Sequence, residues 1–220
     1  MNLKCPKSEG WVKIKSTPGT HSGVLLQYDK INFIMDVLSK LTGILSEIFL
    51  FCVFLYCKKK KKDFNYHLQP VSHLGTSGKI GKIFNAGLLI YTVLRFIFLS
   101  SILTFFSLWN NFLILLSLTI AFPSIIITAI VSLERHRKIH GISGFMIFAF
   151  SVIFIWDLGL ELLKYSYFLG MSNLIIGGSM LVGSLMLILW KKINSYFEFY
   201  IFFLVILWDV LMTLVIFRII

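Results

Sequence analysis

Residues 83–133 read IFNAGLLIYTVLRFIFLSSILTFFSLWNNFLILLSLTIAFPSIIITAIVSL, an apolar stretch long enough for two membrane crossings. One crossing takes about 20 mostly apolar residues. Arg95 is the only charged residue in this stretch, and it falls near the middle of the first crossing. A central arginine costs about 2.5 to 3.5 kcal/mol on insertion scales unless the fold provides a partner or water. The sequence therefore predicts a membrane-embedded fold in which Arg95 has a counter-ion.

The composition also indicates a membrane protein. Of the 220 residues, 57% are hydrophobic and 16% are aromatic, and the mean hydropathy is +0.85. These values exceed what a soluble domain of this length needs to fill its core. The formal charge of +11 comes mostly from Lys and Arg beside apolar runs, where basic residues anchor helix ends. We therefore expect a multipass integral protein of the cell membrane that binds no nucleic acid.

The apolar runs predict an all-α fold, a bundle of six transmembrane helices in residues 41–220. Residues 1–40 are expected to form a polar tail and an interfacial segment. Ile34, Val37 and Leu38 recur there at helical spacing, which is typical of an amphipathic helix in the membrane interface. The six crossings are expected at about 41–57, 83–106, 112–133, 143–163, 173–190 and 196–217.

With six crossings, the longer polar connections fall on one side of the membrane, here called side A. Side A comprises residues 58–82, 134–141 and 191–195 and holds most of the Lys and Arg outside the N-terminal segment. By the positive-inside rule, side A faces the cytoplasm, whereas the basic N-terminal segment favours the opposite orientation. The lysine run Lys58–Lys62 is expected to anchor the first helix and to contact anionic lipids.

Ionisable residues are expected to form one layer in the middle of the membrane. Arg95 and Asp209 lie twelve and thirteen residues after the starts of their crossings, and Asp157 lies twelve after Phe145. In the first helix, which runs in the opposite direction, Glu47 lies eleven residues before Lys58. At 1.5 Å of rise per residue, equal counts place these residues at equal depths. We therefore predict a polar layer of Glu47, Arg95, Asp157 and Asp209, with Arg95 neutralised by one of the aspartates.

The predicted layer has two interpretations. The simpler one is an ion-pair network that fixes helix packing. However, one arginine faces three carboxyl groups, and leaving two anions uncompensated in a low dielectric costs more than protonating them. We therefore expect at least one carboxyl group of the layer to be protonated. Such a site could bind a proton, a cation or a polar lipid group.

A second candidate site lies on side A, in the run ERHRKIH that begins at Glu134. His136 and His140 are spaced to share a helical face, and two such histidines can ligate zinc. The basic residues between them would repel a metal ion, and the run has no HExxH motif. We therefore expect Glu134, His136 and His140 to form a surface at the lipid headgroups, with a metal site as the alternative, and predict no cofactor.

Two further runs carry a family resemblance: VSHLGTSGKIGKIFNAGLLIYTVL, residues 71–94, and IHGISGFMIFAFSVIFI, residues 139–155. They resemble the prokaryotic DUF998 group, related to the Frag1/DRAM/Sfk1 membrane proteins. That family has an SxLG loop before an FN pair at the start of helix 2, and a histidine that opens helix 4. His73 stands where the family commonly has Asp. The matching residues here are Ser72, Leu74, Gly75, Phe84, Asn85 and His140.

The resemblance implies six helices and no established enzymatic activity, with relatives linked to lipid remodelling or organelle membranes. It also implies that the SxLG loop faces away from the cytoplasm, opposite to the orientation that the charges favour. From residue chemistry alone, the glycines permit a tight loop, and Asn85 can cap or cross-link helix ends. A phosphate-binding loop is the alternative, although the spacing is not that of a P-loop.

Three classes of function remain. The leading one is a non-enzymatic multipass protein that acts as an accessory or assembly subunit of a membrane complex or interacts with lipid. The second is a proton- or cation-coupled carrier that uses Arg95, Asp157 and Asp209, although the chain shows no inverted repeat. The third is a membrane-embedded lipid-remodelling hydrolase that uses the side A histidines. The expected partners are the lipid bilayer, including anionic lipids, and other membrane-protein subunits.

Overall fold

The computed structural model describes residues 22–65, 67–76, 78–131, 133, 136–189 and 195–218. The chain divides into two compact units, Met1–Asp36 and Val37–Ile220. In the first unit, the described residues are helical from Ser22 onward. The elements in chain order are α1 (Ser22–Lys60), the short 3-10 helix η1 (Val71–Gly75), α2 (Gly78–Phe105), α3 (Phe112–Ile130), α4 (Arg137–Leu162), α5 (Tyr167–Leu189) and α6 (Ser195–Ile216).

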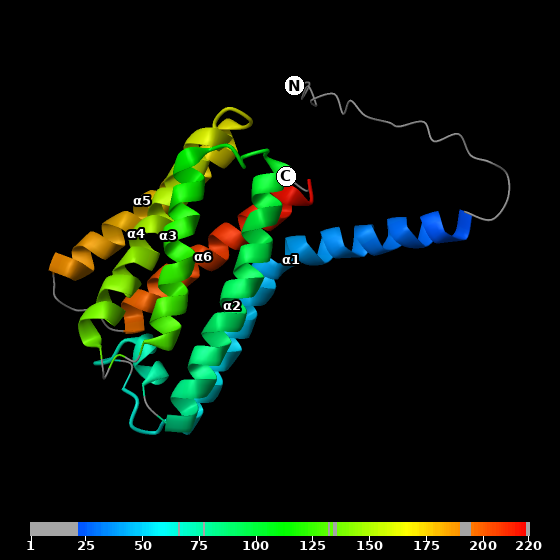
Figure 1. The fold of residues 1–220 in the computed structure, drawn as a ribbon. Coiled ribbons are helices and arrows are strands. Elements are labelled where there is room, and N and C mark those ends of the chain that lie inside the picture. Colours follow the sequence, from blue (N-terminus) through cyan, green and yellow to red (C-terminus); the bar gives the residue numbers. More distant parts are fainter. Residues whose placement is uncertain are drawn as a thin grey trace. The chain divides into compact units, whose positions relative to one another are not determined.

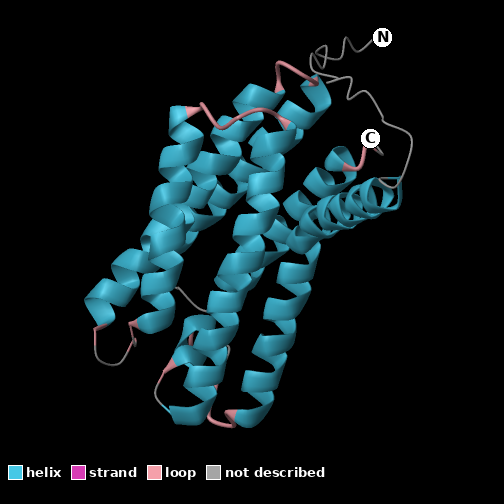
Figure 2. Ribbon diagram, turned by 45° about the vertical axis from the view of Figure 1, so that its right-hand side comes forward, coloured by secondary structure: helices cyan, strands magenta, loops and turns pink. Residues whose placement is uncertain are grey.

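Six of these helices are long and apolar enough to cross a membrane. In α1 the membrane-compatible part is Ile34–Lys60. No strand occurs in the described parts of the chain, and most of their residues are helical (Figure 2). The protein is therefore a multipass integral membrane protein with an all-α, six-helix fold, which confirms the predicted fold class.

The helix ends differ from those expected from the apolar runs. Helix α1 extends without a break across residue 40, where a change from an interfacial segment to the first crossing is predicted. Helices α2, α4 and α5 begin five or six residues before the apolar runs, at Gly78, Arg137 and Tyr167. A helix requires continuous backbone hydrogen bonds and no particular hydrophobicity, so it extends through the polar residues that flank a crossing.

The main core forms where the last five helices meet. Phe98, Leu158, Met180, Trp208 and Met212 are completely buried, and they come from α2, α4, α5 and α6. In Figure 1, α6 runs obliquely relative to α2 and α3. Because α6 is inclined, an equal number of residues along two helices does not mean an equal depth.

Helices α1 and α2 approach each other closely through glycines. A Cβ atom at Gly43 would lie 2.6 Å from the Phe98 ring, and one at Gly87 would lie 2.7 Å from a methyl group of Val53. Both distances are too short for a real contact, so a larger side chain at either position would force the helices apart. This close approach brings the middle of α1 next to Arg95.

Candidate functional site

Three ionisable side chains from three helices meet in the interior of the protein. Glu47 lies on α1, Arg95 on α2 and Asp209 on α6, and their exposed fractions are 2%, 8% and 0%. Arg95 Nη1 donates hydrogen bonds to both carboxylate oxygens of Asp209, and it lies 3.5 Å from Glu47 Oε1. We call Glu47, Arg95 and Asp209 the charge cluster. The cluster gives Arg95 the counter-ion that its place in an apolar helix requires.

Neighbouring side chains hold the charge cluster in position. Tyr91, one turn before Arg95 on α2, donates a hydrogen bond of 2.9 Å to Glu47 Oε1. The Arg95 guanidinium lies 5.7 Å from the ring centroid of Phe98 and 5.4 Å from that of Trp208. Both distances are within the range of a cation–π interaction. The arginine is thus fixed by charge on one side and by aromatic rings on another.

The charge cluster contains one cation and two carboxyl groups, so it carries a net charge of −1 when both carboxyl groups are ionised. Arg95 and Tyr91 occupy Glu47 Oε1 and both oxygens of Asp209. Among the residues that the structure describes, no group donates a hydrogen bond to Glu47 Oε2. A buried acceptor without a donor costs about 1 to 3 kcal/mol. The Glu47 carboxyl group can therefore take up a further hydrogen-bond donor.

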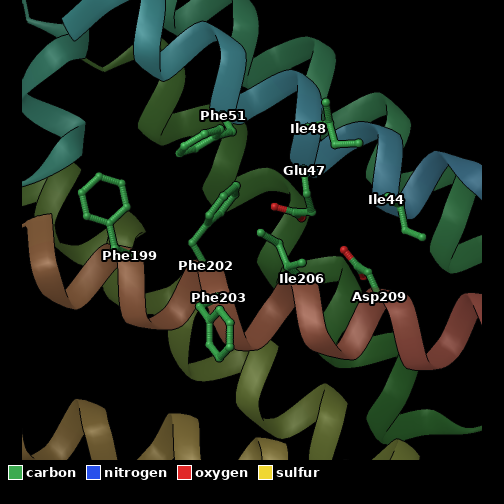
Figure 3. Close-up of a pocket in the computed structure, with 9 residues that line it drawn as sticks. All are labelled: Ile44, Glu47, Ile48, Phe51, Phe199, Phe202, Phe203, Ile206 and Asp209. Carbon is green, nitrogen blue, oxygen red and sulfur yellow. The ribbon is translucent and has the colours of Figure 1, made fainter.

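A groove of about 250 Å³ between α1 and α6 leads to these carboxyl groups (Figure 3). Phenylalanine side chains gather at one end of the groove, and Glu47 and Asp209 lie nearer the other. Phe51 and Phe203, two of its lining residues, are 43% and 63% exposed. Since both helices cross the membrane, these exposed side chains face lipid. The groove is therefore open to the bilayer from the side, and the two buried carboxyl groups lie beneath its largely apolar wall.

Asp157 does not belong to this cluster, which corrects the predicted four-residue layer. It lies in a polar depression of about 510 Å³ at the connection between α2 and α3, with Asn111 and Glu161. Glu161 accepts hydrogen bonds from Asn111 at 3.3 Å and from Lys164 at 2.6 Å. Helix α4 begins at Arg137, before the apolar run used for counting, so Asp157 lies twenty residues after the start of the helix and five before its end at Leu162. We call Asp157, Glu161, Asn111 and Lys164 the peripheral cluster.

The two histidines of the side A run, His136 and His140, lie in different surroundings. His140 is buried, and its Nδ1 lies 2.9 Å from the carbonyl oxygen of Val131, whereas His136 is exposed. Glu134 falls outside the described residues. Within the described part of the chain, no group of three or more His, Cys, Asp or Glu side chains could hold a metal ion. His140 therefore serves as a link between α4 and the end of α3.

The residues of the SxLG and FN motifs come together in one packed unit. Leu74 of η1 is completely buried and packs in a cluster that includes Phe84 of α2. Asn85 Nδ2 donates a hydrogen bond of 3.2 Å to the carbonyl oxygen of Gly75. A Cβ atom at Gly75 would lie 2.4 Å from Asn85 Oδ1, so a larger residue does not fit there. Ser72, in the same 3-10 turn, is half-buried.

Two further contacts tie this loop to the helices around the groove. Glu198, near the start of α6, accepts a hydrogen bond from the backbone amide of Val71. Lys61, just after α1, donates a hydrogen bond of 3.0 Å to the carbonyl oxygen of His73. The loop therefore connects α1, α2 and α6, the same three helices that the charge cluster connects. These contacts give the motif residues a structural role in joining the three helices.

Sequence reasoning did not identify Tyr91, Asn173 or the aromatic wall of the groove. Tyr91 precedes Arg95 by four residues, which puts both on one helix face and is a usable signal. Asn173 carries no signal of its own, yet its Oδ1 accepts a hydrogen bond of 2.6 Å from the buried Trp208 indole. In the sequence alone, the phenylalanines at positions 199, 202 and 203 cannot be told from ordinary lipid-facing residues. Their grouping depends on α1, which lies far away in the sequence.

Comparison with known proteins adds no assignment, since no family model, no curated protein and no solved structure matches the chain.

Proposed function

We propose that this chain is a non-enzymatic, lipid-interacting protein of the cell membrane whose α1–α6 groove accommodates amphiphilic molecules from the bilayer. The observation that carries the proposal is the groove itself. It has apolar walls that contain exposed phenylalanines, and it leads to the buried carboxyl groups of Glu47 and Asp209. An amphiphile has the matching distribution of a long apolar part and a small polar part. The resemblance to the DUF998 group, whose relatives are linked to lipid remodelling, favours the same class.

An accessory or assembly role is the second form of this proposal. The charge cluster and the loop at side A fasten α1, α2 and α6 together, as expected of a rigid unit that docks onto other membrane subunits. Native mass spectrometry after gentle extraction separates the two forms. A stoichiometric protein partner supports the subunit role, whereas a single chain with retained lipid supports lipid interaction alone.

The carrier and hydrolase alternatives have less support. The carrier hypothesis includes Asp157, which lies in the peripheral cluster at the α2–α3 connection. The hydrolase hypothesis uses His136 and His140, but the His140 ring contacts a backbone carbonyl. Of the residues in these two sets, Asp209 of the carrier set lines the α1–α6 groove, whereas Asp157 and the two histidines do not.

Photo-crosslinking tests the proposed lipid interaction directly. The protein would be reconstituted in phosphatidylcholine vesicles with a trace of a diazirine-bearing long-chain alcohol, and the labelled peptides would be identified by mass spectrometry. We expect labelling to concentrate on the groove faces of α1 and α6. Ile48→Trp, at a groove residue that is 55% exposed, should reduce this labelling several-fold because the indole fills the groove.

Ile175→Trp is the matched control, since Ile175 on α5 is 61% exposed and lies outside the groove. It should leave the labelling of α1 and α6 unchanged. Equal labelling of all lipid-facing helices, unaffected by Ile48→Trp, would contradict the proposed function.

A further inference from the structure

We infer that the groove between α1 and α6 binds a single-chain amphiphile with a primary ammonium group, which donates its N–H hydrogen bonds to Glu47. This inference rests on the proposed function and specifies the chemistry of the molecule in the groove. It is carried by the charge of the cluster, the hydrogen-bonding state of Glu47, the character of the walls and the depth of the site.

The charge of the cluster selects for a cation. Arg95 is bonded to both oxygens of Asp209, so this pair is neutral as a unit. Glu47 lies 3.5 Å from the same guanidinium nitrogen and adds a second carboxyl group without adding a second cation. Its side chain is only 2% exposed, so the second negative charge has to be neutralised by a proton or by a bound cation. A bound monocation neutralises the site, whereas an anionic amphiphile is repelled.

The hydrogen bonds of Glu47 select for a donor. Its Oε1 accepts a hydrogen bond from Tyr91. Its Oε2 is buried, and within the described chain it has no hydrogen-bond donor. A primary ammonium has three N–H groups and meets this need, whereas a quaternary ammonium carries the charge without a donor. Charge and hydrogen bonding together therefore favour a primary amine over other cations.

The walls of the groove fit the apolar part of such a molecule. Phe51 on α1 and Phe202 on α6 have ring centroids 6.2 Å apart in a stacked arrangement. Phe203 extends this aromatic surface toward the lipid, with 63% of its surface exposed. An alkyl chain can lie along these rings, and the ring faces attract a cation that passes them.

The depth of Glu47 disfavours the amine of an ordinary phospholipid. Glu47 lies seven residues after Lys40 and eleven before Lys58, the charged residues that flank the apolar part of α1. At 1.5 Å of rise per residue, it lies about 11 Å and 17 Å from these positions. A phospholipid amine is held at the headgroup level, whereas a single-chain amine is small enough to enter the groove from the side.

The inference can be tested with a series of dodecyl compounds that differ only in the polar group. The full-length protein would be placed in phosphatidylcholine nanodiscs, and the binding of tritiated dodecylamine would be measured against empty nanodiscs. We expect saturable binding of one molecule per chain. Unlabelled dodecylamine should compete at least ten-fold better than dodecyltrimethylammonium or dodecanol, and dodecanoate should not compete.

Two pairs of variants locate the site. Glu47→Gln should weaken dodecylamine binding at least ten-fold, whereas Glu161→Gln, at a carboxyl group outside the groove, should leave it unchanged. Should Glu47→Gln fail to fold, Phe203→Ala provides the test, because Phe203 is largely exposed and its loss keeps the charge cluster. It should weaken binding several-fold, and Phe168→Ala, at a residue of α5 that is 64% exposed, is its control.

The outcomes distinguish this inference from the proposed function. Equal competition by dodecylamine and dodecanol, with crosslinking still concentrated in the groove, overturns the inference and leaves the lipid interaction standing. If Glu47 is neutralised by a proton alone, dodecylamine will not bind saturably. The absence of saturable binding would therefore also overturn the inference. If crosslinking of the wild-type protein is not concentrated in the groove, both this inference and the proposed function are overturned.

Discussion

The protein holds two groups of acidic and basic side chains that look alike in the sequence and differ in the structure. In the charge cluster, the side chains of Arg95 and the two acidic residues are at most 10% exposed and connect three helices. In the peripheral cluster, the Lys164 side chain is 68% exposed and pairs with Glu161 three residues earlier on the chain. A buried charge depends on its partner, whereas an exposed charge has water as an alternative.

The largest expected effect is the loss of the buried cation. Arg95→Met leaves Glu47 and Asp209 as buried carboxyl groups without a counter-ion, and we expect the free energy of unfolding to fall by about 3 to 5 kcal/mol. Titration with SDS in mixed micelles, followed by tryptophan fluorescence, measures this change. The corresponding change in the peripheral cluster, Lys164→Met, should cost less than about 0.5 kcal/mol.

A second substitution shows whether uncompensated charge causes the loss. Adding Asp209→Asn to Arg95→Met removes one of the two orphaned carboxyl groups, so part of the stability should return. Strictly additive effects of the two substitutions would indicate that the three side chains do not act as a unit.

A smaller effect is expected from the neutral hydrogen-bond donor of the charge cluster. Tyr91→Phe removes the hydroxyl group that donates to Glu47 and keeps the ring, so stability should fall by about 1 kcal/mol. Tyr165→Phe is the matched control, because its hydroxyl group makes a longer bond of 3.3 Å to a backbone carbonyl and the residue is 53% exposed. Equal losses in both variants would remove the contrast between buried and peripheral bonds.

The smallest expected effect concerns salt. Raising the ionic strength from about 0.1 to 1 M shortens the screening length from about 10 to 3 Å. The stability difference between the wild type and Lys164→Met should then disappear, whereas the difference between the wild type and Arg95→Met should remain, because salt does not enter the buried site. The same SDS titrations at two salt concentrations measure both. A salt-sensitive Arg95 difference would mean that the charge cluster is open to water.

The contrast between the clusters also shows how far the sequence leads. Apolar run lengths are sufficient to find six crossings, and counting residues brought Glu47, Arg95 and Asp209 to one level, where the structure places them in contact. The same count misplaced Asp157, because α4 starts at Arg137, before its apolar run. The depth of a residue depends only on the helix that carries it, whereas a contact between two residues depends on the tilt and rotation of two helices.

The groove could not be predicted from the sequence, because it also depends on how two helices are tilted and rotated relative to each other. Phe51 and Phe202 stack on each other, but they are separated by most of the chain, and each alone resembles a residue that faces lipid. Likewise, nothing in the sequence indicates that Asn173 meets the Trp208 indole. Such pairs follow from helix faces that become neighbours only after the bundle is assembled.

The separation of Arg95 from its partners has a consequence for the synthesis of the chain. Asp209 follows Arg95 by 114 residues, so at about 5 to 20 residues per second the ribosome needs roughly 6 to 23 seconds to reach it. Throughout that interval, Glu47 is the one carboxyl group of the charge cluster that already exists. A hairpin of the first two membrane helices can thus enter the bilayer with its arginine accompanied. The acidic residue that is in excess in the finished protein is the one that the nascent protein needs.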